Sequence, residues 1–142
     1  MRISTRGRYS LEAMLYIALL PTDQLVSTRI ISEQTGISDG YLEQLFIPLK
    51  KAGFIIGVRG AQGGYYLGKS AEDITVGDIL RVVEGPLIPV PCLESKDCAS
   101  LLECKTRYTW GELYKEIHEC IDAIYLSSLV SACRQMEEEE AV

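Results

Sequence analysis

One stretch in the N-terminal half of the chain limits the fold more than any other: VSTRIISEQTGISDGYLEQLFIPLKKAGF. Ser27 is placed to cap a helix over Thr28–Gln34, and Gly36 supplies the left-handed residue that commonly ends one. Ser38 then caps a second helix over Asp39–Ala52, with leucines at helical spacing along its inner side. Two short helices joined by a tight glycine turn are typical of a helix-turn-helix, whose second helix enters the DNA major groove.

The residues after this unit predict a two-stranded β-hairpin. Strand-like runs at Phe54–Val58 and Gly64–Leu67 flank the turn-rich RGAQGG. Glycines in such a tip let the backbone approach DNA closely, and Arg59 suits the narrow, electronegative minor groove. An ordinary hairpin turn or a phosphate-binding loop is the alternative, but phosphate loops precede a helix and here a strand follows. We therefore interpret the hairpin as the wing of a winged helix.

Helical spacing of apolar residues predicts helices on both sides of this unit. One helix covers Ser10–Leu20 and ends at Pro21, and another begins at Thr75 and ends before Gly85. A long helix is expected over residues 108–123, followed by a short one capped by Ser127 and running to about residue 136. The long helix has an apolar stripe, which predicts a dimer interface and comprises Trp110, Leu113, Ile117, Cys120 and Ile124.

Charge divides the chain into two unlike halves. The 142 residues carry a net charge of −6, but residues 1–70 hold eight basic and five acidic residues, which leaves +3. Residues 71–142 hold six basic and fifteen acidic residues, which leaves −9. A basic half joined to an acidic half indicates a DNA-binding module with a separate sensing or pairing segment.

The N-terminus imitates a secretory signal, with arginines before the apolar AMLYIALL. Glu12 interrupts this pattern and Pro21 ends it after too few residues to span a bilayer. We therefore expect a cytoplasmic protein without a membrane partner. Its thiols then stay reduced, and clustered cysteines are expected to be ligands or redox sensors.

Three of the five cysteines stand in the proline-containing segment 85–107, which has no clear periodicity. Five residues separate Cys92 from Cys98, and five separate Cys98 from Cys104. Thiolates suit both zinc and iron–sulfur clusters, but zinc sites generally use tighter CxxC spacing. The spacing favours a [2Fe-2S] cluster held by a loop.

The order of these features resembles the winged-helix regulators typified by IscR, which bind an iron–sulfur cluster. The resemblance covers almost the whole chain and rests on MRISTRGRY, GISDGYLEQLF, VRGAQGGYYLGK and ITVGDILRVVEGP. CymR- and NsrR-type regulators share the same scaffold, so the three cysteines are what favour the cluster-binding members. The implied fold is mainly α with a small β-hairpin: a winged helix-turn-helix DNA-binding domain plus a long C-terminal dimerisation helix.

The recognition helix and the wing supply most of the predicted DNA contacts, and residues near the N-terminus are expected to position the phosphates. Gln44 can read adenine with two hydrogen bonds, and Glu43 can accept one from a cytosine amino group. The resemblance also implies that Glu43 helps to distinguish two promoter classes. The full set of predicted DNA-binding residues is Arg2, Arg8, Tyr9, Ser38, Tyr41, Glu43, Gln44, Arg59 and Gly60.

The fourth ligand of the cluster is left open by the sequence. The resemblance implies a histidine three residues after the last cysteine, where this chain has Arg107, which has no lone pair to give. The preferred candidate is Glu103, because a carboxylate can ligate iron and it lies beside Cys104. The alternatives are His118, Cys120 and Glu12 of the partner subunit. A weak fourth ligand suits a sensor better than an electron carrier.

These observations predict a homodimeric regulator that binds operator DNA. We expect a DNA-binding domain over residues 1–84, a cluster loop over 85–107, and a dimerisation helix, terminal helix and acidic tail over 108–142. The expected role is a repressor that senses cluster status and controls cluster-assembly genes, with assembly or carrier proteins as further partners.

A nitric-oxide or cysteine-metabolism regulator is the alternative on this scaffold. An iron–sulfur redox carrier or a zinc-stabilised interaction module is the alternative of another class. No catalytic constellation stands out, so an enzyme is not expected.

Overall fold

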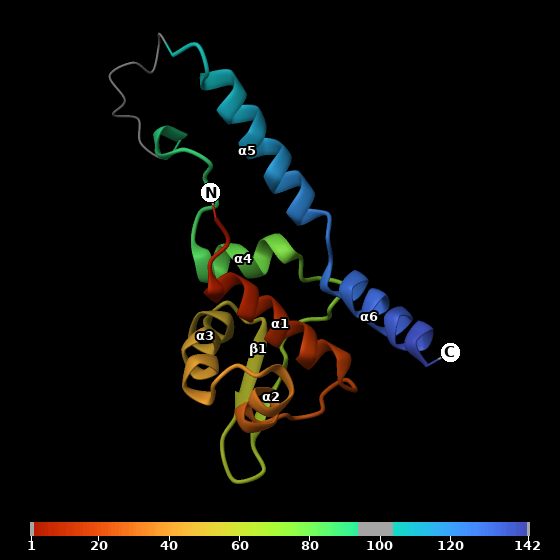
Figure 1. Ribbon diagram of the computed structural model, residues 1–142. Coiled ribbons are helices and arrows are strands. Elements are labelled where there is room, and N and C mark those ends of the chain that lie inside the picture. Colours follow the sequence, from red (N-terminus) through yellow and green to blue (C-terminus); the bar gives the residue numbers. More distant parts are fainter. Residues whose placement is uncertain (1, 94–103, 142) are drawn as a thin grey trace.

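A computed structural model describes residues 2–93 and 104–141, and Figure 1 shows their arrangement. The elements are α1 (Thr5–Leu19), α2 (Thr28–Thr35), α3 (Asp39–Lys51), β1 (Ile55–Val58), β2 (Gly64–Leu67), α4 (Val76–Glu84), the 3-10 turn η1 (Pro91–Leu93), α5 (Arg107–Asp122) and α6 (Leu126–Glu140). The first four helices and the hairpin gather in one body, from which α5 projects before α6 returns beside it (Figure 1).

The predicted helix-turn-helix is confirmed with its caps. The Ser27 hydroxyl accepts the Ile30 amide at 3.3 Å, and the Ser38 hydroxyl accepts the Tyr41 amide at 3.3 Å. Gly36, with φ of 78°, ends α2 in the left-handed conformation that glycine adopts at little cost. The predicted helices differ from α2 and α3 by one residue at the C-terminal end.

The hairpin is also confirmed. β1 and β2 pair antiparallel from Ile55 opposite Leu67 to Val58 opposite Gly64, and an isolated bridge joins Val26 to Tyr65. β1 begins at Ile55, one residue later than predicted, because the Phe54 amide still bonds to the Leu49 carbonyl at the end of α3. The tip of the wing therefore extends from a base that is held to the helix-turn-helix.

α1 begins earlier than the predicted Ser10, at Thr5. The carboxylate of Glu84 at the end of α4 accepts the amides of Ser4 at 3.1 Å and Gly7 at 2.9 Å, and it also accepts the Ser4 hydroxyl. A negative group at a helix N-terminus satisfies free amides and complements the helix dipole. This capping residue lies 77 to 80 positions away in the sequence, so the local pattern could not show it.

α4 is predicted correctly, since Thr75 and Asp78 form a capping box and Val76, Ile79, Leu80 and Val83 are buried. α6 differs from the prediction at both ends. It begins at Leu126, because the Leu126 amide donates to the Ile74 carbonyl at 2.8 Å. It continues through the acidic run to Glu140, four residues beyond the predicted end, since glutamate favours helix.

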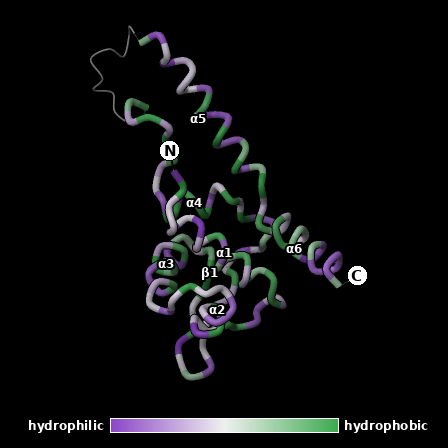
Figure 2. Tube along the Cα trace, in the orientation of Figure 1, coloured by the Kyte–Doolittle hydropathy of each residue, from purple (hydrophilic) through white to green (hydrophobic). Residues whose placement is uncertain are grey.

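One main hydrophobic core lies between α1, α3, α4 and the start of α6. Its fully buried members include Met14, Ile31, Leu42, Leu45, Phe46, Leu49, Ile55, Ile74, Ile79 and Leu126. Figure 2 shows the corresponding change along α6, which is hydrophobic near its start and hydrophilic toward its end. The beginning of the C-terminal helix therefore belongs to the same core as the helix-turn-helix.

Every residue of α5 is half-buried or exposed, in contrast to the other long helices. Its bounds lie one residue before those predicted at each end. Tyr108, Leu113 and Tyr114 are exposed large apolar residues on this helix, and Ile124 follows its end. No helix in the described ranges has the length and apolar character needed to cross a lipid bilayer.

Candidate nucleic-acid interface and cysteine site

The exposed face of α3 carries the predicted major-groove residues. Leu42, Leu45 and Leu49 anchor the opposite face in the core and thereby fix the rotation of the helix. Glu43 and Gln44 are exposed, and Ser38 is exposed at the N-cap. Tyr41 is half-buried. This side of α3 therefore presents a carboxylate and an amide, the groups expected for reading base edges.

The predicted N-terminal contacts lie close to the start of α3. The rings of Tyr9 and Tyr41 meet edge to face with centroids 5.8 Å apart, and the Arg8 guanidinium lies 5.7 Å from the Tyr9 ring centroid. Arg2 and Arg8 line one surface hollow at the start of α1. The tyrosine pair brings Arg8, remote in sequence, to the N-terminal end of the recognition helix.

The wing borders a second hollow, of about 430 Å³, next to the N-terminus of α2. Arg59 and Gly60 at the exposed tip line it, and Gly60 has φ of 115°, which a side chain would disfavour. Thr28 and Lys50 also line this hollow and were missed from the sequence. The sequence signal that could have identified Lys50 is its place in the last turn of the recognition helix. Two cations beside a helix N-terminus suit a phosphate group.

Two of the three predicted cluster ligands lie in the described part of the chain. Cys92 lies in η1 and Cys104 lies three residues before α5; both are half-buried and neither forms a disulfide. Cys98 and the fourth-ligand candidate Glu103 lie outside the described residues. Within residues 2–93 and 104–141, no three His, Cys, Asp or Glu side chains form a group able to hold a metal. The two described thiols fit a soft-metal or cluster site in their donor chemistry.

Cys104 begins a short chain of polar contacts. The Trp110 indole N–H donates to the Thr106 hydroxyl oxygen at 3.2 Å, which leaves that hydroxyl proton free for the Cys104 sulfur at 3.4 Å. A hydrogen bond to sulfur favours the thiolate, so the Thr106 hydroxyl and then its amide lower the pKa of the Cys104 thiol. Thiolate is the form that binds metal.

Thr106→Val is expected to move the pKa of Cys104 upward toward that of an ordinary thiol, because valine cannot donate to sulfur. In metal-free protein, the pH midpoint for alkylation of Cys104 should rise, as measured by mass spectrometry of the Cys104 peptide. Cys133 in the same samples is the internal reference and should keep its midpoint. An unchanged midpoint for Cys104 would show that the threonine hydroxyl has no part in its acidity.

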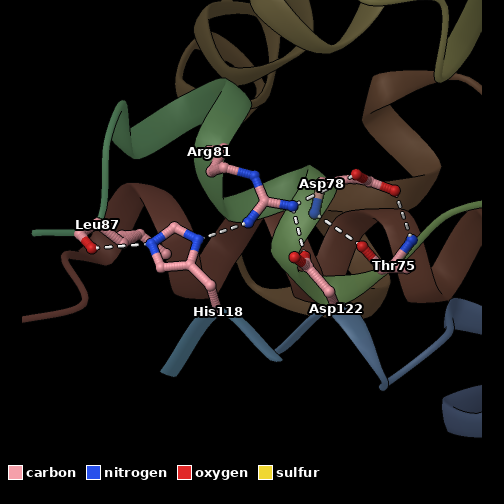
Figure 3. Close-up of polar contacts among 6 residues, drawn as sticks. All are labelled: Thr75, Asp78, Arg81, Leu87, His118 and Asp122. Atoms are coloured by element: carbon pink, nitrogen blue, oxygen red, sulfur yellow. Dashed lines mark hydrogen bonds and ion pairs between the residues drawn. The ribbon is translucent and has the colours of Figure 1, made fainter. Parts of the chain in front are cut away.

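A polar network joins α4 to α5 and was missed from the sequence (Figure 3). The Arg81 guanidinium contacts His118 Nδ1 at 3.0 Å, pairs with Asp122, and lies 3.6 Å from Asp78. His118 Nε2 lies 3.1 Å from the Leu87 carbonyl. Because guanidinium has only donors, Nδ1 accepts and Nε2 carries the proton donated to Leu87.

This network also bears on the fourth-ligand candidates. Both ring nitrogens of His118 are used within the protomer, by Arg81 and by Leu87. Cys120 and Glu12 are exposed on α5 and α1, and Arg107 is exposed at the first position of α5. A β-carbon at Gly77 would collide with the Asp122 carboxylate, so a larger residue there would force that side chain to move.

Known proteins share this arrangement. A family model described as "Rrf2: Iron-dependent Transcriptional regulator" matches residues 3–132. The chain is 40% identical over 131 residues to the HTH-type transcriptional regulator CymR of Bacillus subtilis, which covers 92% of this chain and 91% of the relative. It is 41% identical over 130 residues to the HTH-type transcriptional regulator IscR of Photobacterium profundum, which covers 92% and 76%.

Structural similarity supports the same assignment. The solved structure of CymR (YrzC), the global cysteine regulator of B. subtilis, matches with a TM-score of 0.78 and 39% identity over 93% of this chain and 98% of that one. The predicted winged-helix fold is confirmed, and the relatives are transcriptional regulators rather than enzymes. From its sequence, its fold and the surface of its recognition helix, the chain belongs to the Rrf2 family of transcriptional regulators.

Proposed function

We propose that this regulator is a homodimeric repressor whose affinity for its operators depends on a [2Fe-2S] cluster. One observation carries the proposal. The loop that contains the cysteines leaves α4 at Gly85 and enters α5 at Arg107, and the Leu87 carbonyl at its start is bonded to His118 of α5. A change in this loop therefore acts directly on the joint between the DNA-binding body and the proposed dimer helix.

Cys92, Cys98 and Cys104 would hold the cluster, with Glu103 as the proposed fourth ligand. Bound there, a cluster supplies redox and oxidant sensitivity that the amino acids lack. The residues of the chain have separate tasks. Thr106 donates to the Cys104 sulfur, and Trp110 fixes the orientation of the Thr106 hydroxyl. The proposed targets are cluster-assembly genes, and assembly or carrier proteins are proposed as further partners.

The exposed apolar stripe of α5 supports the homodimer. Of its members, Leu113 is 41% exposed and Ile124 is 36% exposed, along a helix that projects from the body (Figure 1). Such a face is typical of an interface with a second copy. A two-fold dimer would present two α3 helices to half-sites about one helical turn apart, or a multiple of that spacing.

The division of the chain into three functional parts is also a proposal. Residues 1–84 would bind DNA, 85–107 would hold the cluster, and 108–142 would form the dimer and the acidic end. The third part returns to the first, since Leu126 lies in the main core and the Tyr125 backbone bridges to Thr75. Movement of α5 would therefore be transmitted to the DNA-binding body at two points, the Arg81 network and the start of α6.

The proposed coupling is tested with Arg81→Ala. In the wild type, loaded and cluster-free protein should differ in operator affinity by about 5- to 150-fold, the usual range of coupling between sites. Without Arg81, His118 and Asp122 lose their shared partner on α4, and this ratio should fall toward one. Binding is measured without air by fluorescence anisotropy, on operators selected from a random duplex library.

Lys115→Ala is the matched control, because it removes an exposed ion pair with Glu119 on the same helix. It should keep the wild-type ratio. Equal affinity of loaded and cluster-free wild type for every operator would contradict the proposed function itself. A wild-type ratio in Arg81→Ala, with normal cluster content, would contradict only the route through Arg81.

The predicted wing contact is tested by salt dependence. The observed association constant for a cognate duplex should fall steeply with salt, by about 0.9 in log K per log unit of salt for each phosphate neutralised. Arg59→Ala should reduce this slope by about one such step, since Arg59 is exposed at the wing tip. Arg134→Ala, an exposed arginine on α6, should leave the slope unchanged. A wild-type slope near zero would argue against DNA binding.

A cysteine-metabolism regulator is the second candidate, favoured by the 40% identity to CymR over nearly the whole of both chains. A nitric-oxide sensor on this scaffold is a third. If protein purified without air contains iron and sulfide, this result supports the cluster sensor. Colourless protein without metal, but with specific duplex binding, supports the CymR-like role. Colourless protein with one zinc per chain supports the zinc-stabilised interaction module. Coloured protein that does not bind duplex DNA supports the redox carrier.

A further inference from the structure

An exposed isoleucine on the recognition helix has no role in the fold or in the predicted polar contacts. Ile47 is 58% exposed, more than Ile30 at 42%, Ile56 at 41% and Val58 at 44%. Its neighbours Phe46 and Leu49 are buried in the core and do not need it. Isoleucine is also a mediocre helix former because of its β-branch. Neither packing nor helix propensity explains this residue.

Ile47 continues the face of α3 that carries the predicted base contacts. Exposed residues recur at three- and four-residue steps along this face, which comprises Gly40, Glu43, Gln44, Ile47 and Lys51. Ile47 lies one turn beyond Glu43 and about 4.5 Å further along the helix axis than Gln44. Ile47 therefore shares the exposed face of Gln44 and would meet a further base edge when this face lies in the major groove.

We propose that Ile47 is a specificity-determining residue that packs against the 5-methyl group of a thymine in each half-site. The thymine methyl is the one apolar group on a major-groove base edge, and aliphatic contact with it distinguishes thymine from the other bases. The inference rests on the proposed DNA contact of α3. It adds an apolar reader to the two polar ones already predicted.

The charges around Ile47 favour DNA over an apolar protein partner. Lys50 and Lys51 follow it in the last turn of α3, and Lys50 lines the hollow beside the wing together with Arg59. An apolar side chain next to cations can approach bases while the cations approach phosphates. The dimer stripe lies elsewhere, since α3 and α5 lie on different sides of α4 (Figure 1).

The test compares thymine with uracil, which lacks only the methyl group. Full-length protein purified without air first selects a duplex from a random library, and each thymine of that duplex is then replaced by uracil. For wild type, replacement of the contacted thymine in a single half-site should weaken binding about fourfold, the effect expected from one buried methyl. For Ile47→Ala the same replacements should change affinity by less than a factor of two. Ile47→Val should keep an intermediate response.

Ile30→Ala is the matched control, as an exposed isoleucine of α2 outside this face. It should keep the full response to uracil, and all three variants should unfold at the wild-type temperature. Equal responses of wild type and Ile47→Ala at every thymine would overturn the inference while leaving DNA binding intact. Failure to select any duplex would overturn the proposed function and this inference with it.

Discussion

Replacing Cys104 by serine is expected to remove nearly all bound iron and acid-labile sulfide from protein purified without air. A serine hydroxyl is a hard donor that stays protonated near neutral pH, so it is a poor substitute for a thiolate on iron. The loss should be seen as absent visible absorption and confirmed by iron and sulfide analysis. Cys92→Ser should behave in the same way.

The chain contains its own controls for this experiment. Cys120 is exposed on α5 and Cys133 is half-buried on α6, and both lie outside residues 85–107 in the sequence. Cys120→Ser and Cys133→Ser should keep the wild-type absorption and iron content. Iron retained at the wild-type level in Cys104→Ser, or lost in Cys120→Ser, would contradict the proposed ligand set. A fourth variant, Glu103→Ala, then addresses the remaining ligand.

Replacing Leu126 by alanine is expected to lower the free energy of unfolding by about 2–5 kcal/mol. The side chain is fully buried in the main core, and such a truncation loses both apolar burial and packing around the cavity that remains. It also lies where the Leu126 amide joins α6 to the Ile74 carbonyl. Urea denaturation followed by circular dichroism, at one fixed protein concentration because of the proposed dimer, measures the change.

Met136→Ala is the matched control on the same helix, where the side chain is 60% exposed. Its effect should stay within about 0.5 kcal/mol, as is usual for surface substitutions. A similarly small effect for Leu126→Ala would mean that α6 does not belong to the core of the DNA-binding body. In that case the proposed second point of transmission from α5 would also be lost.

Most of the fold could be predicted from local sequence signals. Ser27, Gly36 and Ser38 determine the ends of two helices through their own backbone and side-chain chemistry, so a short window was sufficient. The hairpin followed from glycines and β-branched residues for the same reason. The errors at the starts of α1 and α6 arose because the groups that stabilise these starts, Glu84 and the Ile74 carbonyl, lie far away in the sequence.

In the candidate sites, too, local patterns could be predicted and contacts between distant residues could not. The exposed positions of Glu43, Gln44 and Arg59 could be predicted, because helical spacing and a hairpin turn place them locally; their DNA contacts stay a prediction. The role of His118 could not be predicted, since its two partners lie 37 and 31 residues away. Thr28 and Lys50 were missed because they line one hollow only where the folded wing lies beside the start of α2.

The helix-turn-helix, the wing and the exposed polar face of the second helix could be read from short windows of sequence, because each depends on residues close together in the chain. The joints between these parts could not be read in this way. Arg81, His118 and Asp122 connect α4 to α5, Tyr9 meets Tyr41, and Leu126 enters the main core. Hydrogen bonds and packing act over a few ångströms in space, whatever the separation along the chain, so these contacts exist only in the folded protein.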